Sequence, residues 1–274
     1  MPRPVAAPLP VAAALAAVAF FAFSTAASAA FDAASDPAPW RSVGRVHTRT
    51  TLPDDAAPAA VGGRASPVVF LLPDEVWDAR RAWPYLDRLS SLGVAVVELW
   101  PDQDQRLTLA DARAAIAAAT DEFGIDPSRV ALLGFGTGGR MALALAARDR
   151  PAVALYPACE GAPALDRDAR AMVLHPDEAR EARACAALTA GRPGARADRA
   201  STGAGHAWDV VVEQVDGRLL LPHPDDPNAL SRRLPAYPDN WATFRAAQAV
   251  SRFLLADPPA AHLPAAASGV QAAP

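Results

Sequence analysis

Short apolar runs alternate with amphipathic segments along the middle of the chain. Continuous apolar runs of this length are typical of buried strands, and the segments between them have the periodicity of helices. Three amphipathic segments separate the strands, at Val76–Leu92, Thr108–Gly124 and Asp177–Leu188. The predicted strands are Ser66–Leu72, Val94–Trp100, Arg129–Gly134, Ala152–Tyr156, Ala171–His175 and Ala195–Ser201. This alternation predicts an α/β fold with a mostly parallel central sheet and helices on both faces.

The pattern changes after residue 206. Two apolar runs around Asp216-Gly217 predict a hairpin over Val210–Leu221. A Pro- and Asp-rich loop, Pro222–Asn240, leads into an amphipathic helix over Asn240–Ala256 that closes the domain. The Ala/Pro-rich tail, residues 257–274, is expected to be disordered.

The N-terminus has the layout of a secretory signal peptide. Arg3 precedes the uncharged apolar run Val11–Ala26, and the A-x-A site Ala27–Ala29 follows it. We therefore expect a signal peptide over residues 1–29 and a secreted or periplasmic protein, with membrane association only if the segment stays uncleaved. A Pro/Ala-rich leader over residues 30–65, with one edge strand near Val43–Val46, then precedes a domain over residues 66–256.

Charge and cysteine content narrow the class of protein. The net charge is −4, all 26 basic residues are Arg, and they form no basic stripe, so the sequence argues against nucleic-acid binding. The two cysteines, Cys159 and Cys185, predict one disulfide in an exported protein.

The glycine-rich stretch LLGFGTGGR, at residues 132–140, fits two motifs. Gly134, Gly136 and Gly139 match the dinucleotide fingerprint G-x-G-x-x-G. Gly134, Gly136 and Gly138 match the nucleophile elbow G-x-S-x-G with glycine in place of serine. In an elbow, Thr137 is one residue past the apex, where it supplies a backbone N–H rather than a nucleophile.

The elbow interpretation assigns further site residues. His206, in the turn GAGHAWD after the last strand, is where a triad histidine belongs, and Asp177 and Glu178 follow the strand from which the acid comes. A metal site from His175, Asp177 and His206 lacks a recognised ligand spacing, so we expect neither a metal nor a cofactor.

Several motifs in the order DPSRVALLGFGTGGR, ALYPACEG, MVLHPDEAREARACAAL and GAGHAWD resemble the dienelactone hydrolase family, in particular its exported members. The resemblance covers about residues 66–256 and implies an α/β-hydrolase fold and a Cys/Ser–Asp–His triad that acts on lactones or esters. It places the base at His206 and the cysteine pair at Cys159 and Cys185. It leaves the acid open between Asp177 and Glu178.

The same resemblance places the nucleophile at Gly136, which has no side chain. The family's oxyanion motif falls on Pro73-Asp74, where proline offers no N–H and a carboxylate repels an oxyanion. The sequence therefore predicts a pseudo-hydrolase that binds a small ester- or lactone-like ligand, or a protein partner.

Two alternatives stay open. One is a residual or altered hydrolase that uses His206 with Asp177 or Glu178, or Thr137. The other is a dinucleotide-binding protein with Glu160 as the ribose-binding acid. The second is disfavoured, because the fingerprint follows the third predicted strand rather than the first and leaves the GAGHAWD turn unexplained.

Overall fold

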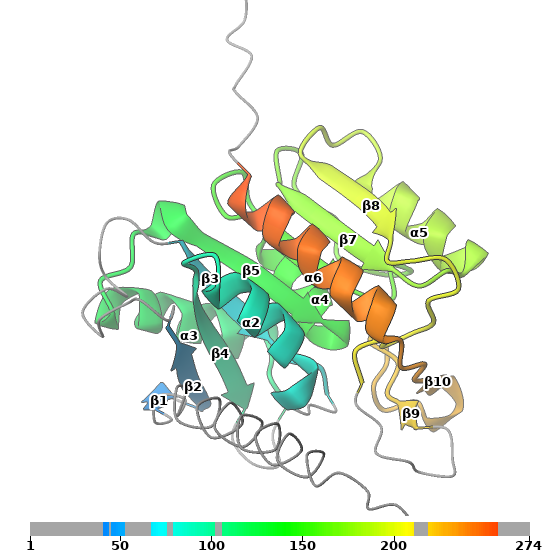
Figure 1. Ribbon diagram of the computed structural model, residues 1–274, viewed down its shortest axis with the longest axis horizontal. Coiled ribbons are helices and arrows are strands. Elements are labelled where there is room, and N and C mark those ends of the chain that lie inside the picture. Colours follow the sequence, from blue (N-terminus) through cyan, green and yellow to red (C-terminus); the bar gives the residue numbers. More distant parts are fainter. Residues whose placement is uncertain are drawn as a thin grey trace, which may run out of the picture. The chain divides into compact units, whose positions relative to one another are not determined.

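The computed structural model describes residues 41–43, 45–52, 67–75, 79–101, 106–210 and 219–256. All of them belong to one compact unit of the chain, Pro39–Pro274. Its centre is an eight-stranded sheet in the order β1-β2-β4-β3-β5-β6-β7-β8 (Figure 1). The strands are β1 Arg41–Val43, β2 Val46–Thr51, β3 Val68–Leu72, β4 Ala95–Pro101, β5 Val130–Phe135, β6 Ala152–Leu155, β7 Ala171–His175 and β8 Ala195–Arg199. From β4 to β8 the neighbouring strands are parallel, and β2 pairs antiparallel with both β1 and β4.

Helices cover both faces of the sheet, as the alternating pattern predicts. The helical elements are η2 Ala79–Arg81, α2 Trp83–Ser90, α3 Leu109–Glu122, η3 Pro127–Arg129, α4 Gly136–Leu145, α5 Ala179–Thr189, η4 Leu230–Arg232 and α6 Asn240–Leu255. Strand β3 shows the two layers, because Val69 and Leu71 pack in the cluster that contains α2 and α6, whereas Val68 and Phe70 pack with α3, α4 and α5. Figure 1 shows α2 and α6 side by side across one face. Every residue of β3 is therefore buried, which explains its unbroken apolar run.

The parallel strands and the closing helix are confirmed within a residue or two of their predicted ends. The capping box is also present: the Thr108 hydroxyl accepts the Asp111 N–H and donates to the Asp111 carboxylate. The helix expected from Val76 is shorter than predicted. Its α-helical part begins at Trp83 because Pro84 at the second position favours a helix start there, and residues 76–78 lie outside the described part.

Two segments differ from the expectation. The leader contributes a hairpin of two strands, β1 and β2, to the sheet rather than one strand near Val43–Val46. Most of the hairpin predicted over Val210–Leu221 lies outside the described residues. Its described end, β9 (Leu220–Leu221), pairs antiparallel with β10 (Leu234–Pro235) in a separate small sheet.

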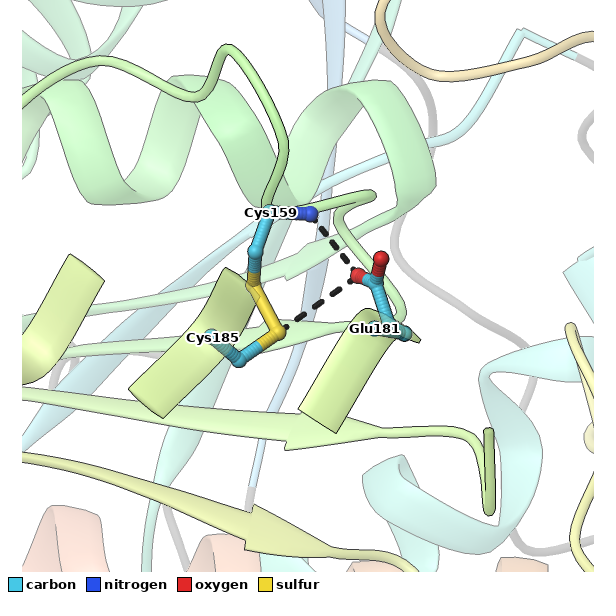
Figure 2. A group of neighbouring side chains, drawn as sticks. All are labelled: Cys159, Glu181 and Cys185. Atoms are coloured by element: carbon cyan, nitrogen blue, oxygen red, sulfur yellow. Dashed lines mark hydrogen bonds between the residues drawn. A yellow bond between two sulfur atoms is a disulfide. The ribbon is translucent and has the colours of Figure 1, made fainter. Parts of the chain in front are cut away.

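The predicted disulfide joins Cys159, in the loop after β6, to Cys185 in α5. Figure 2 shows Glu181 beside it, from the preceding turn of α5. The Cys159 N–H donates to Glu181 Oε1 over 2.7 Å, and Cys185 Sγ lies 3.4 Å from the same oxygen. The bond fixes α5, and with it the acidic residues that precede this helix, against the end of β6. No helix among the described residues is long and apolar enough to span a bilayer.

Candidate functional site

The glycine-rich turn lies at the carboxyl end of β5, where the chain enters α4. Gly136 is the first residue of α4, and its φ of +48° is in the left-handed region that favours glycine. Gly134 and Gly138 allow close approach, because a Cβ on Gly134 would overlap the Gly138 carbonyl and a Cβ on Gly138 would overlap the Leu72 carbonyl. The chain thus makes a tight strand-to-helix turn, as the glycine spacing predicts, and the residue at its apex, Gly136, has no side chain.

A carboxylate fills the space beside that apex. Asp74 follows β3, and a Cβ built on Gly136 would lie 2.5 Å from Asp74 Oδ1 and 2.6 Å from its Cγ. Asp74 is only 5% exposed. Its Oδ1 accepts the Glu75 N–H over 2.8 Å, and more weakly the N–H and hydroxyl of Thr137, both over 3.4 Å. Any side chain at residue 136 would therefore have to displace a hydrogen-bonded carboxylate.

Arg81 joins this carboxylate to a second one across the base of the site. Its Nη2 lies 3.5 Å from Asp74 Oδ2, and its Nε lies 3.2 Å from Asp209 Oδ1. The same guanidinium donates to the Tyr156 hydroxyl over 2.5 Å. That hydroxyl in turn donates to Asp209, with its oxygen 2.8 and 2.9 Å from the two carboxylate oxygens. The cluster is almost wholly excluded from solvent, so its polar groups depend on one another. Asp74 Oδ2 is the exception among the described residues, because it makes no hydrogen bond and has only the 3.5 Å ion pair with Arg81.

The electrostatics of the cluster follow from two carboxylates and one guanidinium. Burial raises the pKa of Asp74 and of Asp209, and Arg81 opposes the shift in both. Burial alone would lower the pKa of Arg81, but Tyr156, Asp209 and Asp74 together raise it, so the guanidinium stays charged. Removal of one member of this cluster would leave a buried charge without compensation, so substitution of any of them is expected to destabilise the fold.

His206 lies in the turn after β8 and is 4% exposed. Its ring packs edge-to-face on Tyr156, with 5.0 Å between centroids. Burial, followed by the charges of Arg81 and His223, lowers the pKa of His206 to about 3, so the imidazole is neutral near pH 7. Nε2 is buried and has no hydrogen-bond partner within the described part of the chain. A buried ring nitrogen without a partner is uncommon and is compatible with a bound water or ligand atom.

His206 borders a cleft of about 370 Å³ at the carboxyl edge of the sheet, a size that suits a small organic ligand. The other residues that line it are Ala158, Glu160, Pro176, Glu178, Arg180, Glu181, His223, Ser231, Arg232, Arg233 and Leu234. Backbone strain gathers around this cleft. Tyr156, Ala158 and Ala207 are the non-glycine residues with positive φ among those described, and all three adjoin His206 or the cleft. Strain of this kind is typical of functional sites.

The two candidate acids have different surroundings. Asp177 accepts from Arg199 Nη1 over 2.8 Å and from the Gly203 N–H over 2.7 Å. The Gly203 N–H and then Arg199 hold the pKa of Asp177 below its usual range. Glu178, at the N-cap of α5, makes no capping bond with its side chain and lines the cleft with His206. Of the two, Glu178 shares a cavity with His206, whereas both Asp177 oxygens are engaged elsewhere.

The remaining candidate residues have partners within the described part of the chain. His175 Nδ1 pairs with the Pro176 carbonyl over 2.7 Å. Among the described residues, the one group placed to hold a metal is Cys159, Glu181 and Cys185 (Figure 2), and its two sulfurs are joined in the disulfide. At the start of α4, where a dinucleotide phosphate would bind, Asp74 already occupies the anion position.

Sequence reasoning missed Arg81, Tyr156 and Asp209. Asp209 ends the quoted GAGHAWD turn, but no motif assigns it a role there. Arg81 belongs to an amphipathic segment in which an arginine is expected on the solvated face, yet it is 1% exposed. The sequence signal for these three residues is weak, because they lie 53 to 128 residues apart and meet only in the fold.

No family model and no curated protein matches the sequence. Among solved structures, the chain is similar to m3DLH with 18% identity and a TM-score of 0.51, over 80% of this chain and 95% of that one. It also matches a dienelactone hydrolase from Anabaena variabilis ATCC 29413, at 18% identity and a TM-score of 0.45, over 60% and 85% of the two chains. At such identities the likeness concerns the fold alone, and the chain has an α/β-hydrolase fold.

Proposed function

We propose that this chain is an exported pseudo-hydrolase that binds a small ester- or lactone-like ligand in the His206 cleft without hydrolysing it. The observation that carries the proposal is the Asp74 carboxylate in the space that a nucleophile on residue 136 would need. Fold alone does not decide the function of an α/β-hydrolase-like protein, so the proposal rests on this site.

Three features argue against hydrolysis. First, Gly136 carries no nucleophile. Second, the Thr137 N–H, which follows the apex and would help stabilise an oxyanion, points instead at Asp74 Oδ1, and Pro73 has no N–H to add. Third, the depressed pKa of His206 makes its imidazole a weak base, far from the value near neutrality that suits a general base.

Two features of the site suit the binding of a small ligand. The cleft has a volume of about 370 Å³, and His206 Nε2 lacks a partner among the described residues. According to its tautomer, this nitrogen accepts from a hydroxyl or donates to a carbonyl oxygen of the ligand. The arginines along the cleft supply further donors to oxygen atoms, which favours an oxygen-rich small molecule.

Export is part of the proposal. The apolar run and A-x-A site at the N-terminus support a cleaved signal peptide, and the Cys159–Cys185 disulfide is compatible with an oxidising compartment. N-terminal sequencing of the protein recovered from the host's extracellular or periplasmic fraction tests this part directly. We expect the mature chain to begin at residue 30.

The functional test measures turnover and binding on the same preparation. The oxidised chain is incubated with p-nitrophenyl acetate beside His206→Gln and Thr137→Val variants. We expect all three to release nitrophenol at the same low rate. Calorimetry with γ-butyrolactone should detect binding by the parent that His206→Gln loses. Parent turnover that His206→Gln or Thr137→Val abolishes would overturn the proposal.

A second candidate is a weak hydrolase in which His206, oriented by Glu178, activates a water molecule. One observation favours it: both residues line the same cleft. It predicts parent turnover that His206→Gln and Glu178→Gln both lower, with Asp177→Asn as a matched control that retains activity.

A further inference from the structure

A second cavity lies away from the His206 cleft, along the open edge of the sheet. Its volume is about 690 Å³, and we call it the β8–α6 groove. Figure 1 shows α6 crossing the face of the sheet next to β7 and β8. The side chains that define it are Arg196 and Arg199 of β8 and Trp241, Phe244, Arg245 and Arg252 of α6.

One side of the groove is formed by the last strand of the sheet. Strand β8 is last in the sheet order and, among the described strands, pairs only with β7. Its outer edge therefore offers backbone N–H and C=O groups to an added strand, which is a common mode of peptide recognition.

The other wall is one stripe of α6. Trp241, Phe244, Gln248 and Arg252 recur at spacings of three or four residues, so they share one face of the helix. The helix has 16 residues and is therefore about 24 Å long. An extended peptide of about seven residues spans the same length.

The groove is cationic although the chain as a whole is acidic. It is lined by four arginines and by Asp198 as its one acidic residue. Arg196 pairs with Asp198 over 3.0 Å, and Arg199 pairs with Asp177 over 2.8 Å. Arg245 and Arg252 are exposed and have no carboxylate partner within the described residues. The net charge of the chain is −4, so this excess of positive charge is local.

Two large aromatic side chains lie open at the start of the same stripe. Trp241 and Phe244 are 61% and 51% exposed, and their rings stack at 5.6 Å between centroids. An exposed aromatic pair beside unpaired arginines is the composition of a binding surface rather than of ordinary solvated surface.

We propose that the β8–α6 groove binds an acidic, extended peptide segment of another protein as an added strand on β8. The peptide's backbone pairs with the open edge of β8. Its acidic side chains face Arg245 and Arg252, and an apolar side chain packs on Trp241 and Phe244. This interaction is independent of the His206 cleft.

The test uses a fluorescein-labelled seven-residue peptide of alternating Val and Glu and fluorescence anisotropy with the full oxidised chain. We expect saturable binding that weakens at least tenfold in the double variant Arg245→Glu/Arg252→Glu and also weakens in Trp241→Ala. Arg113→Glu, an exposed arginine on α3, is the charge-matched control and should retain parent affinity. The same peptide with Lys for Glu should not bind.

A version of the peptide with N-methyl groups on alternate residues separates strand addition from simple charge attraction. When the methyl groups lie on the edge that faces β8, binding should be lost. Equal binding of the methylated peptide, or no difference between Arg245→Glu/Arg252→Glu and Arg113→Glu, would overturn the proposal. Two other results would also overturn it. If the acidic peptide fails to bind and the Arg245→Glu/Arg252→Glu variant instead abolishes binding to phosphatidylserine vesicles, the groove binds a membrane. If the peptide fails to bind and the variant instead abolishes self-association, the groove binds a second copy of the chain.

Discussion

The substitution Gly136→Ala tests how firmly the Asp74 carboxylate is held in the space beside residue 136. Gly136→Ala forces an L-residue to φ +48°, which costs about 1–2 kcal/mol. The new Cβ would also lie 2.5 Å from Asp74 Oδ1, and overpacking of this kind costs about 1–3 kcal/mol. We therefore expect Gly136→Ala to lower the free energy of unfolding by about 2–5 kcal/mol.

Two companion variants separate the two costs. Gly93→Ala meets a similar backbone constraint, φ +78°, with nothing within 4 Å of the added Cβ, so it reports the backbone cost alone. In an Asp74→Ala background the clash is absent, so Gly136→Ala should then cost no more than Gly93→Ala does. The coupling energy between residues 74 and 136 is expected to be about 1–3 kcal/mol.

Urea unfolding followed by tryptophan fluorescence measures all of these values under oxidising conditions. The reasoning fails if Gly136→Ala costs no more than Gly93→Ala in the parent chain. It also fails if the cost of Gly136→Ala is the same with and without the Asp74 side chain. Either result would mean that the carboxylate moves aside freely and that the apex is open to a side chain.

Three further predictions concern the surroundings of the site. The folded pKa of His206, about 3, is below its value of 6.5 in a free chain, so its contribution to stability is present above pH 6.5 and is lost as pH falls toward 3. That loss is about 4–5 kcal/mol in full, and the free energy of unfolding measured at pH 7 and pH 4 should fall less in His206→Gln than in the parent. Tyr156→Phe removes the hydroxyl between Arg81 and Asp209 and should lower the free energy of unfolding by about 1–3 kcal/mol in the same urea assay. An unchanged urea midpoint would contradict the stabilising role of this hydroxyl. Replacement of both Cys159 and Cys185 by Ser should cost about 3–4 kcal/mol, because it removes a cross-link with a sequence separation of 26, and a change below about 1 kcal/mol contradicts this.

The sequence predicts most of the sheet because strands β3 to β7 are buried on both faces, so their apolar runs are continuous and easy to recognise. The glycine spacing at residues 134, 136 and 138 likewise predicts a tight turn, since only glycine tolerates such close backbone approach. The local sequence pattern is therefore enough to predict the fold and the position of the turn.

Which side chains meet in the site depends on the pairing register of strands that are far apart in the sequence, and the sequence does not reveal that register. Parallel pairing of β3 with β5 sets Leu72 opposite Gly134, and this register brings Asp74 to the apex two residues later. The position of Asp177 after β7 predicts a triad acid, but pairing of His175 with Arg199 puts an arginine within reach of the Asp177 carboxylate. Arg81 is buried although its amphipathic segment predicts a solvated face, because Asp74, close by in the sequence, and the distant Asp209 compensate its charge.

We propose that no group at the glycine-rich turn acts as a nucleophile, and intact-mass spectrometry tests this most directly. The oxidised full chain is incubated with a fluorophosphonate and, separately, with excess p-nitrophenyl acetate, and its mass is then measured. We predict no covalent adduct with either reagent beyond that formed by the His206→Gln variant. A stoichiometric adduct that maps to Thr137 or Asp74 and disappears in His206→Gln would contradict the account, and would show that another residue has taken over the role of nucleophile.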